Sequence, residues 1–345
     1  MKILYGVQAT GNGHITRARA LLPALQQNGI EVDFLFSGRR QSELFDMDMF
    51  GDYRFASGFT FASADGKVRK LATVRQLQPV QFCRDVRQLD LSAYDLVLTD
   101  FEPVTAWAAK RQNKLAVGLA RQYSLRYPLA GRQSANWLKS AVCAFAPANL
   151  MLGVHWQPEF PDLLPPLLTP AKVLSGNTNK DMHSPFILVY LPFEQNAKII
   201  NWLKQCPSWH FKLYTNVKEL YTEDNVTILP LSRSGFPTDL QRCSGVICNS
   251  GFGLCSEALI AGKKLLVKPL QGQIEQAYNT YTLLKMGKAE QFHHFTPEPL
   301  LNWLYKPAVE PYPLPDPAIA IAGWLKKGCS TSVTTLAASI WQQQH

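Results

Sequence analysis

The sequence predicts an α/β protein made of two doubly wound domains, each built on a parallel sheet, with a cleft between them. Three observations support this prediction. The length of 345 residues suits two domains of ordinary size. Strand-like apolar runs alternate with helical patterns along most of the chain, as in parallel sheets that helices cover on both faces. A proline-rich stretch, residues 157–185, interrupts the alternation near the middle.

The first domain is expected to span residues 1–160. Its strands are predicted from apolar runs at residues 2–9, 31–37, 94–100, 115–120 and 150–155. After the first run, apolar side chains recur at helical spacing from Ile15 to Leu25, and Asn28-Gly29 provides a stop signal. The amino terminus therefore reads as a strand, a glycine turn and a helix.

A linker is expected over residues 161–185 and a second domain over residues 186–317. The strands of the second domain are predicted at residues 186–191, 210–215, 226–231, 245–249 and 264–270. Its helices are predicted at residues 194–205, 237–243, 254–262 and 273–286. A last helix is predicted over about residues 318–345, and one option is that it packs back against the first domain. Both domains are expected to be Rossmann-like.

Composition limits the function classes without choosing one. The net charge of +9 points to an anionic partner, which could be nucleic acid, acidic lipid headgroups or a phosphorylated small molecule. The seven cysteines form no CxxC pair, so free thiols in a reducing compartment are expected. No apolar stretch has the length of a membrane span or a signal peptide. A cytoplasmic location is predicted, with a peripheral position on the inner face of the membrane as an option.

Two glycine turns are the strongest local motifs. Gly11-Asn12-Gly13-His14 follows a strand of the first domain, and Asn249-Ser250-Gly251-Phe252-Gly253 follows a strand of the second. Ligands of doubly wound sheets bind beyond the carboxyl ends of the strands, and a helix N-terminus there favours an anion. A dinucleotide fingerprint is disfavoured, because Thr16 replaces its third glycine and no acidic residue ends the second strand.

The segment "CNSGFGLCSEALIAGKKLLVKPLQGQIEQAYN", which begins at Cys248, resembles the donor-binding region of inverting glycosyltransferases of the two-domain GT-B type. The nearest parallels are UDP-glycosyltransferases and the lipid-linked N-acetylglucosaminyltransferase of peptidoglycan synthesis. The elements that match in order are Ser250-Gly251, Ser256-Glu257, Pro269, Glu275-Gln276 and Asn279. The retaining branch of the fold carries two glutamates eight positions apart, and here Asn249 stands eight residues before Glu257.

The resemblance implies roles for these residues. Glu257 would accept hydrogen bonds from the donor ribose, since a carboxylate is an acceptor with two oxygens. Backbone N–H groups of the turn would bind the diphosphate, and Glu275 and Gln276 would bind sugar hydroxyls. Some relatives have a histidine where this chain has Asn249, and Lys268 or an arginine could supply the missing charge. The full donor-binding set is Gly11, Gly13, Asn249, Ser250, Gly251, Phe252, Gly253, Ser256, Glu257, Glu275, Gln276 and Asn279.

The resemblance also implies a catalytic role for His14, as the general base that takes the proton of the acceptor hydroxyl. Asp100, at the end of a later strand of the same domain, would orient it. Histidine suits this role because it titrates near neutral pH. Two alternatives stay open. His14 could bind phosphate without moving a proton, and Asp100 could be the N-cap of a helix that starts near Pro103.

The partners expected are a nucleotide-sugar donor, most simply a UDP-sugar, and a hydroxyl acceptor that is lipid-linked or part of a cell-envelope glycan. No cofactor and no metal are expected, because the chain has no DxD triplet. A basic surface is predicted on the acceptor side, from Lys67, Arg69, Lys70, Arg75, Arg84, Arg87, Arg121, Arg126 and Arg132. Residues 138–154 could lie on an anionic membrane or form a core helix. Nucleic acid is disfavoured because no known binding module is present.

Three other functions remain possible on the same fold. The segment "GNGHITRARALLPAL" also resembles the turn of a nucleotide-sugar hydrolase of nonulosonic-acid synthesis, in which water replaces the acceptor. A sugar-nucleotide epimerase and a non-catalytic nucleotide-sugar-binding protein are the others. The leading prediction is an inverting glycosyltransferase of the hexosyltransferase type.

Overall fold

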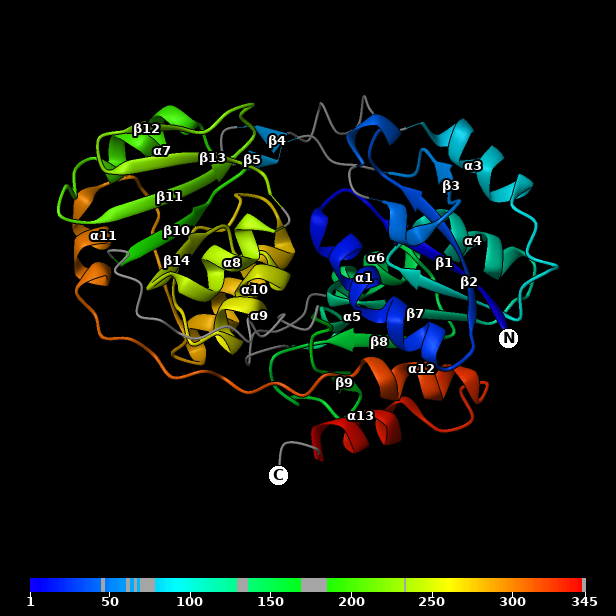
Figure 1. The fold of residues 1–345 in the computed structure, drawn as a ribbon. Helices are drawn as coiled ribbons and strands as arrows, with labels where there is room; N and C mark the ends of the chain where they lie inside the picture. The colour runs from blue at the N-terminus through cyan, green and yellow to red at the C-terminus, as the bar shows by residue number, and fades with distance from the viewer. Residues whose placement is uncertain are drawn as a thin grey trace. The chain divides into compact units, whose positions relative to one another are not determined.

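The computed structural model describes residues 1–44, 47–59, 63–64, 67–68, 78–128, 136–168, 185–232 and 234–342. The chain divides into two units, each with its own seven-stranded sheet (Figure 1). Unit 1 comprises Met1–Ala62, Arg69–Thr169 and Leu314–His345, and unit 2 comprises Ser63–Val68 and Pro170–Pro313. The short antiparallel pair β4 (Ser63–Ala64) and β5 (Lys67–Val68) therefore groups with unit 2, although the sequence placed it in the first domain.

The sheet of unit 1 has the strand order β3-β2-β1-β6-β7-β8-β9, and every neighbouring pair is parallel. Its central strands β1, β6 and β7 are almost wholly buried, which explains why they read as continuous apolar runs rather than alternating ones. The strands are β1 (Lys2–Gln8), β2 (Glu31–Ser37), β3 (Arg54–Ala56), β6 (Leu96–Asp100), β7 (Ala116–Ala120), β8 (Leu150–Val154) and β9 (Leu163–Leu164).

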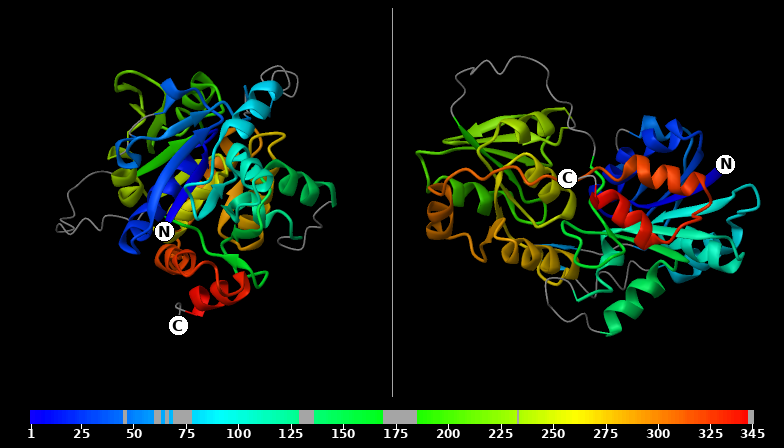
Figure 2. Two further views of the ribbon diagram at one scale, coloured as in Figure 1. Left: turned by 90° about the vertical axis from the view of Figure 1, so that its right-hand side faces the viewer. Right: turned by 90° about the horizontal axis from the view of Figure 1, so that it is seen from below.

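Helices pack against this sheet from segments far apart in the chain. The helices are α1 (Asn12–Gln27), α3 (Pro79–Gln88), α4 (Pro103–Arg111), α5 (Arg121–Ser124), α6 (Asn136–Phe145), α12 (Ala318–Lys326) and α13 (Val333–Trp341). The C-terminal helices lie beside the N-terminal elements (Figure 2). The Lys326 ammonium donates to the Gly29 carbonyl at 3.0 Å, and the Trp341 indole donates to the Leu163 carbonyl at 2.7 Å. The end of the chain thus completes unit 1.

The sheet of unit 2 has the order β12-β13-β11-β10-β14-β15-β16, and it is parallel except for the edge strand β12. Its strands are β10 (Phe186–Tyr190), β11 (His210–Thr215), β12 (Tyr221–Glu223), β13 (Val226–Pro230), β14 (Gly245–Cys248), β15 (Lys264–Val267) and β16 (Ala289–Gln291). Its helices are α7 (Asn196–Leu203), α8 (Gly235–Arg242), α9 (Phe252–Ile260), α10 (Ile274–Lys285) and α11 (Pro297–Leu304). The predicted class, two doubly wound Rossmann-like domains, is confirmed.

Two predicted boundaries are wrong. The linker was expected from residue 161, but Leu163 and Leu164 are buried and form β9, the edge strand beside β8. Short strands inside a proline-rich stretch give no periodic signal. Residues 169–184 of the predicted linker lie outside the described residues. The single last helix is also wrong, because Gly328 and Cys329 adopt positive φ angles of 67° and 57° and end α12, and Ser332 caps a separate helix, α13.

Among the described residues, no helix has both the length and the apolar character that crossing a bilayer requires. The stretch 138–154, for which membrane contact was one option, is divided between α6 and the buried strand β8. Leu138 and Val142 of α6 are buried, whereas Trp137 is 61% exposed. The buried residues of this stretch therefore belong to the core of unit 1.

Candidate active site

The first glycine turn joins β1 to α1 and faces open space. Gly11 is the residue before the helix and has an extended backbone, with φ −132° and ψ 157°. A Cβ atom added at Gly11 or Gly13 meets no described atom within 4 Å, and neither residue has a positive φ. The chain's own geometry therefore does not require glycine at these positions. The unpaired N–H groups of the first helical turn are available to an anion there.

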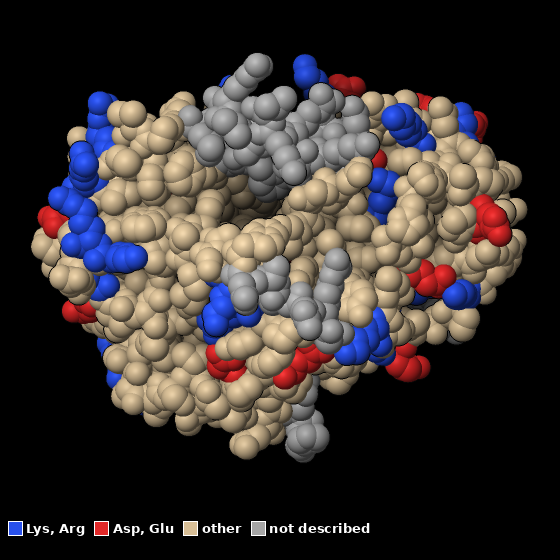
Figure 3. Space-filling view, turned by 180° about the vertical axis from the view of Figure 1, so that it is seen from behind, with Lys and Arg blue, Asp and Glu red and all other residues tan. Residues whose placement is uncertain are grey.

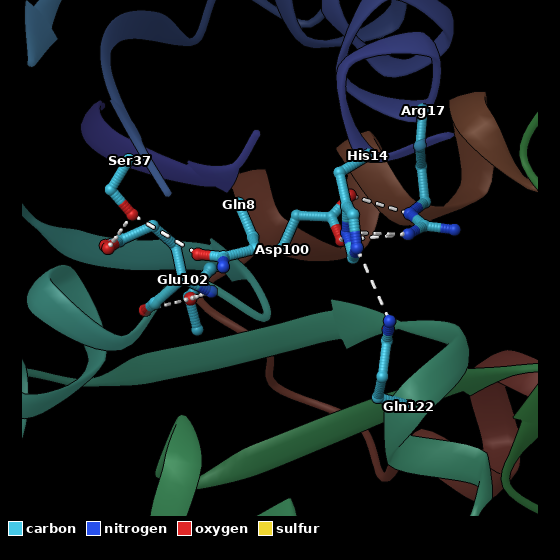
Figure 4. Close-up of polar contacts among 8 residues, drawn as sticks. Gln8, His14, Arg17, Ser37, Asp100, Glu102 and Gln122 are labelled. Atoms are coloured by element: carbon cyan, nitrogen blue, oxygen red, sulfur yellow. Dashed lines mark hydrogen bonds and ion pairs between the residues drawn. The ribbon is translucent and has the colours of Figure 1, made fainter. Parts of the chain in front are cut away.

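His14 and Asp100 are brought together by the sheet. β1 and β6 are neighbouring parallel strands with Val7 paired to Asp100, so the turn after β1 and the end of β6 lie at the same sheet edge. His14 Nδ1 lies 2.6 Å from Asp100 Oδ1 (Figure 4). The Asp100 side chain is fully buried, and the His14 side chain is 11% exposed. The predicted pair therefore exists as a contact.

Arg17 completes this cluster, and the sequence analysis did not identify it. Its Nε donates to Asp100 Oδ2 at 2.6 Å and its Nη2 donates to Oδ1 at 2.9 Å, so the guanidinium holds both oxygens. Burial works to raise the pKa of Asp100, but the charges of Arg17 and then His14 outweigh it and lower the pKa below the ordinary value. The signal was present in the sequence, because residues three apart on a helix share a face.

The contacts of the imidazole define its hydrogen positions. Nδ1 also lies 3.2 Å from the donor Arg17 Nη2, but its much shorter contact is with Asp100 Oδ1 at 2.6 Å. Because an ionised carboxylate only accepts, this contact assigns the hydrogen of the neutral ring to Nδ1. Nε2 then keeps its lone pair. Gln122 of α5 places its side-chain nitrogen 3.4 Å from Nε2, at the loose end of hydrogen-bonding range (Figure 4). A ring held on one nitrogen and open to a proton on the other is equipped to act as a base.

The alternative interpretation of Asp100 as a helix N-cap is wrong, because Glu102 caps α4 instead. The Glu102 carboxylate accepts from the N–H groups of Val104 and Thr105 at 2.9 and 2.7 Å, and from the Ser37 hydroxyl at 2.7 Å. Between the two acids, Phe101 has a φ of 54°. This left-handed residue turns the chain sharply, so that Asp100 serves the glycine turn while Glu102 serves the helix.

The second glycine turn, in unit 2, joins β14 to α9. Gly251 has a φ of −67°, and a Cβ atom added there meets only Asn249 O, at 3.9 Å. A Cβ atom added at Gly253 meets no described atom within 4 Å. As in unit 1, the glycines leave space over the helix N-terminus without being needed for a positive φ.

Neutral side chains support this turn from α10. Ser250 Oγ donates to the Gln276 carbonyl at 2.9 Å and accepts from Thr280 Oγ1 at 2.7 Å, and Asn279 Nδ2 donates to the Ser250 carbonyl at 2.9 Å. Gln276 Oε1 in turn accepts from the N–H of Leu270 at 2.7 Å. All of these side chains are buried. The matching motif residues are therefore used inside the protein, whereas their direct contact with a ligand stays a prediction.

Two further motif residues are also held within unit 2. Ser256 is fully buried, and its hydroxyl donates to the Phe252 carbonyl one turn earlier at 2.7 Å. Asn249 donates through Nδ2 to the Lys268 carbonyl at 2.8 Å. The suggestion that Lys268 supplies charge to the turn is wrong, because its ammonium pairs with Glu194 at 2.6 Å.

Glu257 differs from the other motif residues near the second glycine turn. It lies on α9 and is half-buried, and no described residue forms a hydrogen bond or ion pair with its carboxyl group. Burial raises the pKa of Glu257 to about 7. An unpartnered carboxyl in such a place is costly unless a ligand satisfies it. Glu275 is half-buried in the first turn of α10.

The arginines expected on the acceptor side fall into different environments. Arg121 is 1% exposed and donates to the Val154 carbonyl, so it belongs to the interior. Arg126 pairs with Asp162. Both were wrongly expected on the surface, because each follows a strand end where buried polar contacts are needed. The Lys67 side chain and Arg69, Lys70, Arg75 and Arg132 lie outside the described residues. The described residues contain no cluster of three His, Cys, Asp or Glu side chains that could hold a metal.

Solved structures with this fold are GT-B glycosyltransferases. The glycosyltransferase of kitacinnamycin is 15% identical, with a TM-score of 0.60 over 99% of this chain and 98% of that one. UGT89C1 of Arabidopsis thaliana in complex with UDP is 15% identical, with a TM-score of 0.57 over 100% and 99%. VinC in complex with dTDP is 15% identical, with a TM-score of 0.56 over 99% of each chain. At these identities the likeness establishes the fold.

The family is established by sequence. The model of Glycosyl transferase family 1 matches residues 1–307. The chain therefore belongs to this family and is a glycosyltransferase, as the two glycine-turn motifs predicted. No curated protein sequence matches the chain significantly.

Proposed function

We propose that the enzyme transfers a sugar with inversion from a nucleotide-sugar, most simply a UDP-sugar, to a hydroxyl acceptor, with His14 as the general base. The observation that carries this proposal is the buried Asp100 carboxylate 2.6 Å from His14 Nδ1, beside a glycine turn that faces open space. Complexes of UGT89C1 with UDP and of VinC with dTDP support a nucleoside diphosphate as the leaving group.

The chemistry proceeds in one displacement. The acceptor hydroxyl gives its proton to His14 Nε2 while its oxygen attacks the anomeric carbon. The bond from that carbon to the diphosphate breaks, and the diphosphate leaves with the electron pair. Asp100 keeps the ring oriented and stabilises the imidazolium as it forms.

The donor is proposed to bind at the second glycine turn. N–H groups at the start of α9 and the dipole of that helix stabilise the diphosphate. Glu257 accepts from the ribose hydroxyls, and Glu275 and Gln276 hold the sugar. No metal or cofactor is assigned to the reaction, so activity is expected to survive EDTA. Complete loss with EDTA, restored by Mg²⁺ or Mn²⁺, would contradict this assignment.

The acceptor is proposed to be anionic and lipid-linked, and the enzyme to work in the cytoplasm at the inner membrane face. Helices α3 and α4 of unit 1 expose Arg84, Arg87, Lys110 and Arg111. Figure 3 shows Lys and Arg side chains gathered along one edge of the face that it presents. Val80, 74% exposed, lies on the same helix as Arg84 and Arg87. Such a surface suits anionic headgroups. Binding to phosphatidylglycerol vesicles but not phosphatidylcholine vesicles is expected, and equal binding to both would remove the membrane from the proposal.

One experiment separates the competing activities. The enzyme is incubated with a panel of radiolabelled nucleotide-sugars, first alone and then with a membrane lipid extract. Transfer predicts an intact donor in the first arm and labelled lipid in the second. Release of free sugar without acceptor would identify a hydrolase, and an epimerised donor would identify an epimerase. No reaction with any donor, together with tight UDP-sugar binding, would indicate a binding protein.

A further inference from the structure

We propose that Arg17 is a positioning residue that keeps His14 available as a neutral base by balancing the charge of Asp100. This inference rests on the proposed function of His14. It starts from the shared carboxylate, in which Oδ1 faces both His14 Nδ1 at 2.6 Å and Arg17 Nη2 at 2.9 Å. Oδ2 is held by Arg17 Nε at 2.6 Å. Arg17 therefore makes two contacts with Asp100, and His14 makes one.

The charge count explains why this matters. A carboxylate with no exposure to solvent needs a positive partner. Arg17 and His14 can both provide the positive charge. The guanidinium of Arg17 is always charged, whereas the imidazole of His14 is charged only when it is protonated. With Arg17 in place the pair is neutral, so the buried acid does not draw a proton onto His14. Without Arg17, an imidazolium would be the available counter-charge, and a protonated ring cannot act as a base.

A second described cation, Arg39, donates to Asn12 Oδ1 at 3.0 Å and to the Thr10 carbonyl at 3.4 Å, whereas the two oxygens of Asp100 face Arg17 and His14. Gln122, opposite Nε2, is neutral. Tyr5 of β1 and Tyr123 of α5 are fully buried, and burial raises the pKa of both phenols well above the ordinary value, so they stay uncharged. Glu102 is committed to the N-cap of α4, and burial raises its pKa. Arg17 is thus the guanidinium bonded to the Asp100 carboxylate, and its positive charge is the one that balances that acid.

The geometry also explains why the arginine follows the histidine by three residues. Both side chains leave the same face of the first turns of α1, so one helix presents the base and the cation to one carboxylate. Arg19, two residues further on, instead stacks over Phe50, with its guanidinium carbon 5.5 Å from the ring centroid. Arg19 is therefore the matched control, since it is an arginine of the same helix whose described contact is with Phe50.

The test compares pH profiles of kcat/KM for the wild type, Arg17→Met, Arg17→Lys, Arg19→Gln and the double variant Arg17→Met with Asp100→Asn. Arg17→Met is expected to move the acid limb upward by about one pH unit or more, the usual effect of a nearby charge. At a pH on the acid limb, a move of one unit corresponds to a tenfold fall in kcat/KM, and activity should recover as the pH rises. Arg17→Lys should move the limb less, and Arg19→Gln should not move it. In the double variant both charges are gone, so the limb should return toward its wild-type position.

A second measurement does not depend on activity. Nitrogen-15 NMR of the imidazole, assigned with His14→Ala, reports ring protonation directly. The neutral ring is expected to carry its hydrogen on Nδ1 in the wild type, and Arg17→Met is expected to hold the protonated ring up to a higher pH than the wild type does. The same ring titration without a change in the activity profile would uphold the role of Arg17 and contradict His14 as base. Loss of activity at every pH with an unchanged titration, in folded Arg17→Met or Arg17→Lys, would overturn the proposal.

Discussion

The two glycine turns have the same backbone design and opposite side-chain chemistry. Each follows a buried parallel strand, opens a helix and leaves space where a Cβ atom would meet no close neighbour. The turn of unit 1 is supported by an ionic cluster, His14, Asp100 and Arg17. The turn of unit 2 is supported by hydroxyl and amide groups, with Ser250 and Asn279 at the centre.

This difference fits the division of labour in the proposed function. Moving a proton requires a titratable ring whose charge state the surroundings control, and an ionic cluster provides that control. Holding a ligand that is already charged requires fixed N–H dipoles, and a network of neutral groups fixes them without adding a competing anion. The turn of unit 1 therefore suits catalysis, and the turn of unit 2 suits donor binding.

The largest expected effect is that of His14→Ala. Turnover should fall by about 10²–10⁴, the usual contribution of a positioned base, with UDP-sugar affinity nearly unchanged. Asp100→Asn should cost the same or less, and the double variant should be far from additive because the two residues act as one unit. Steady-state kinetics and calorimetry measure both quantities. Wild-type turnover at saturation with weakened donor binding would mean that His14 binds phosphate and that the two turns share one task.

Glu257→Ala tests the other side of the comparison. UDP-sugar affinity should fall about 10- to 100-fold, because a hydrogen bond to a charged group contributes about 1.5–3 kcal/mol. Turnover at saturating donor should be largely retained. Calorimetric titration with UDP and with the UDP-sugar checks this. An unchanged dissociation constant would remove Glu257 from the donor site.

Glu257→Gln should also change stability in a pH-dependent way. The unfolded chain ionises this glutamate near the ordinary value of 4.5, whereas burial raises the pKa in the folded chain to about 7. The unfolded state therefore loses its proton first, and the folded state loses stability as the pH rises between these values. At pH 8 the glutamine variant should be more stable by about 1–3 kcal/mol, since one pKa unit corresponds to about 1.4 kcal/mol.

Denaturant unfolding at pH 4 and pH 8 measures this difference. The two proteins should be nearly equal at pH 4, where the carboxyl group is mostly protonated in both states. The same gain at both values of pH would contradict the raised pKa. Saturating UDP-sugar should reduce the gain at pH 8, because the ribose hydroxyls would then satisfy the carboxylate.

The sequence predicted most strands of the two sheets well, because buried strands form short continuous apolar runs that differ from the helical pattern. Strand β2 and strand β11 begin and end at the predicted residues. Short edge elements such as β9 were missed, because two residues carry no periodicity. The His14 and Asp100 pair was predicted from the resemblance to UDP-glycosyltransferases, and the structure brings the two together because two strand ends meet at one edge of a parallel sheet.

The rest of the site depends on side-chain direction, which spacing alone does not determine. Arg17 and Arg19 are both arginines of α1. The Arg17 side chain bonds to Asp100, whereas the Arg19 side chain lies over the ring of Phe50. Likewise Ser250 and Asn279 matched a ligand-binding motif, but their side chains are buried. The Ser250 hydroxyl donates to the Gln276 carbonyl of α10, and the Asn279 amide donates to the Ser250 carbonyl. A motif identifies residues that a site needs, whether they contact the ligand or hold those that do.

The smallest expected effect is that of Gly253→Ala, and it sharpens the comparison most. Alanine in the first turn of α9 meets no described neighbour within 4 Å, so stability should stay equal or rise by up to about 1 kcal/mol from helix propensity. UDP affinity should fall about tenfold, because the methyl group occupies space that a phosphate needs and such crowding costs about 1–3 kcal/mol. Gly13→Ala is the matched change in unit 1, and it should reduce turnover more than UDP affinity. Thermal unfolding and UDP titration of both variants decide the matter: if the two substitutions weaken UDP binding equally, the turns do not divide the work, and the ionic cluster of unit 1 would have to be reinterpreted as part of the donor site.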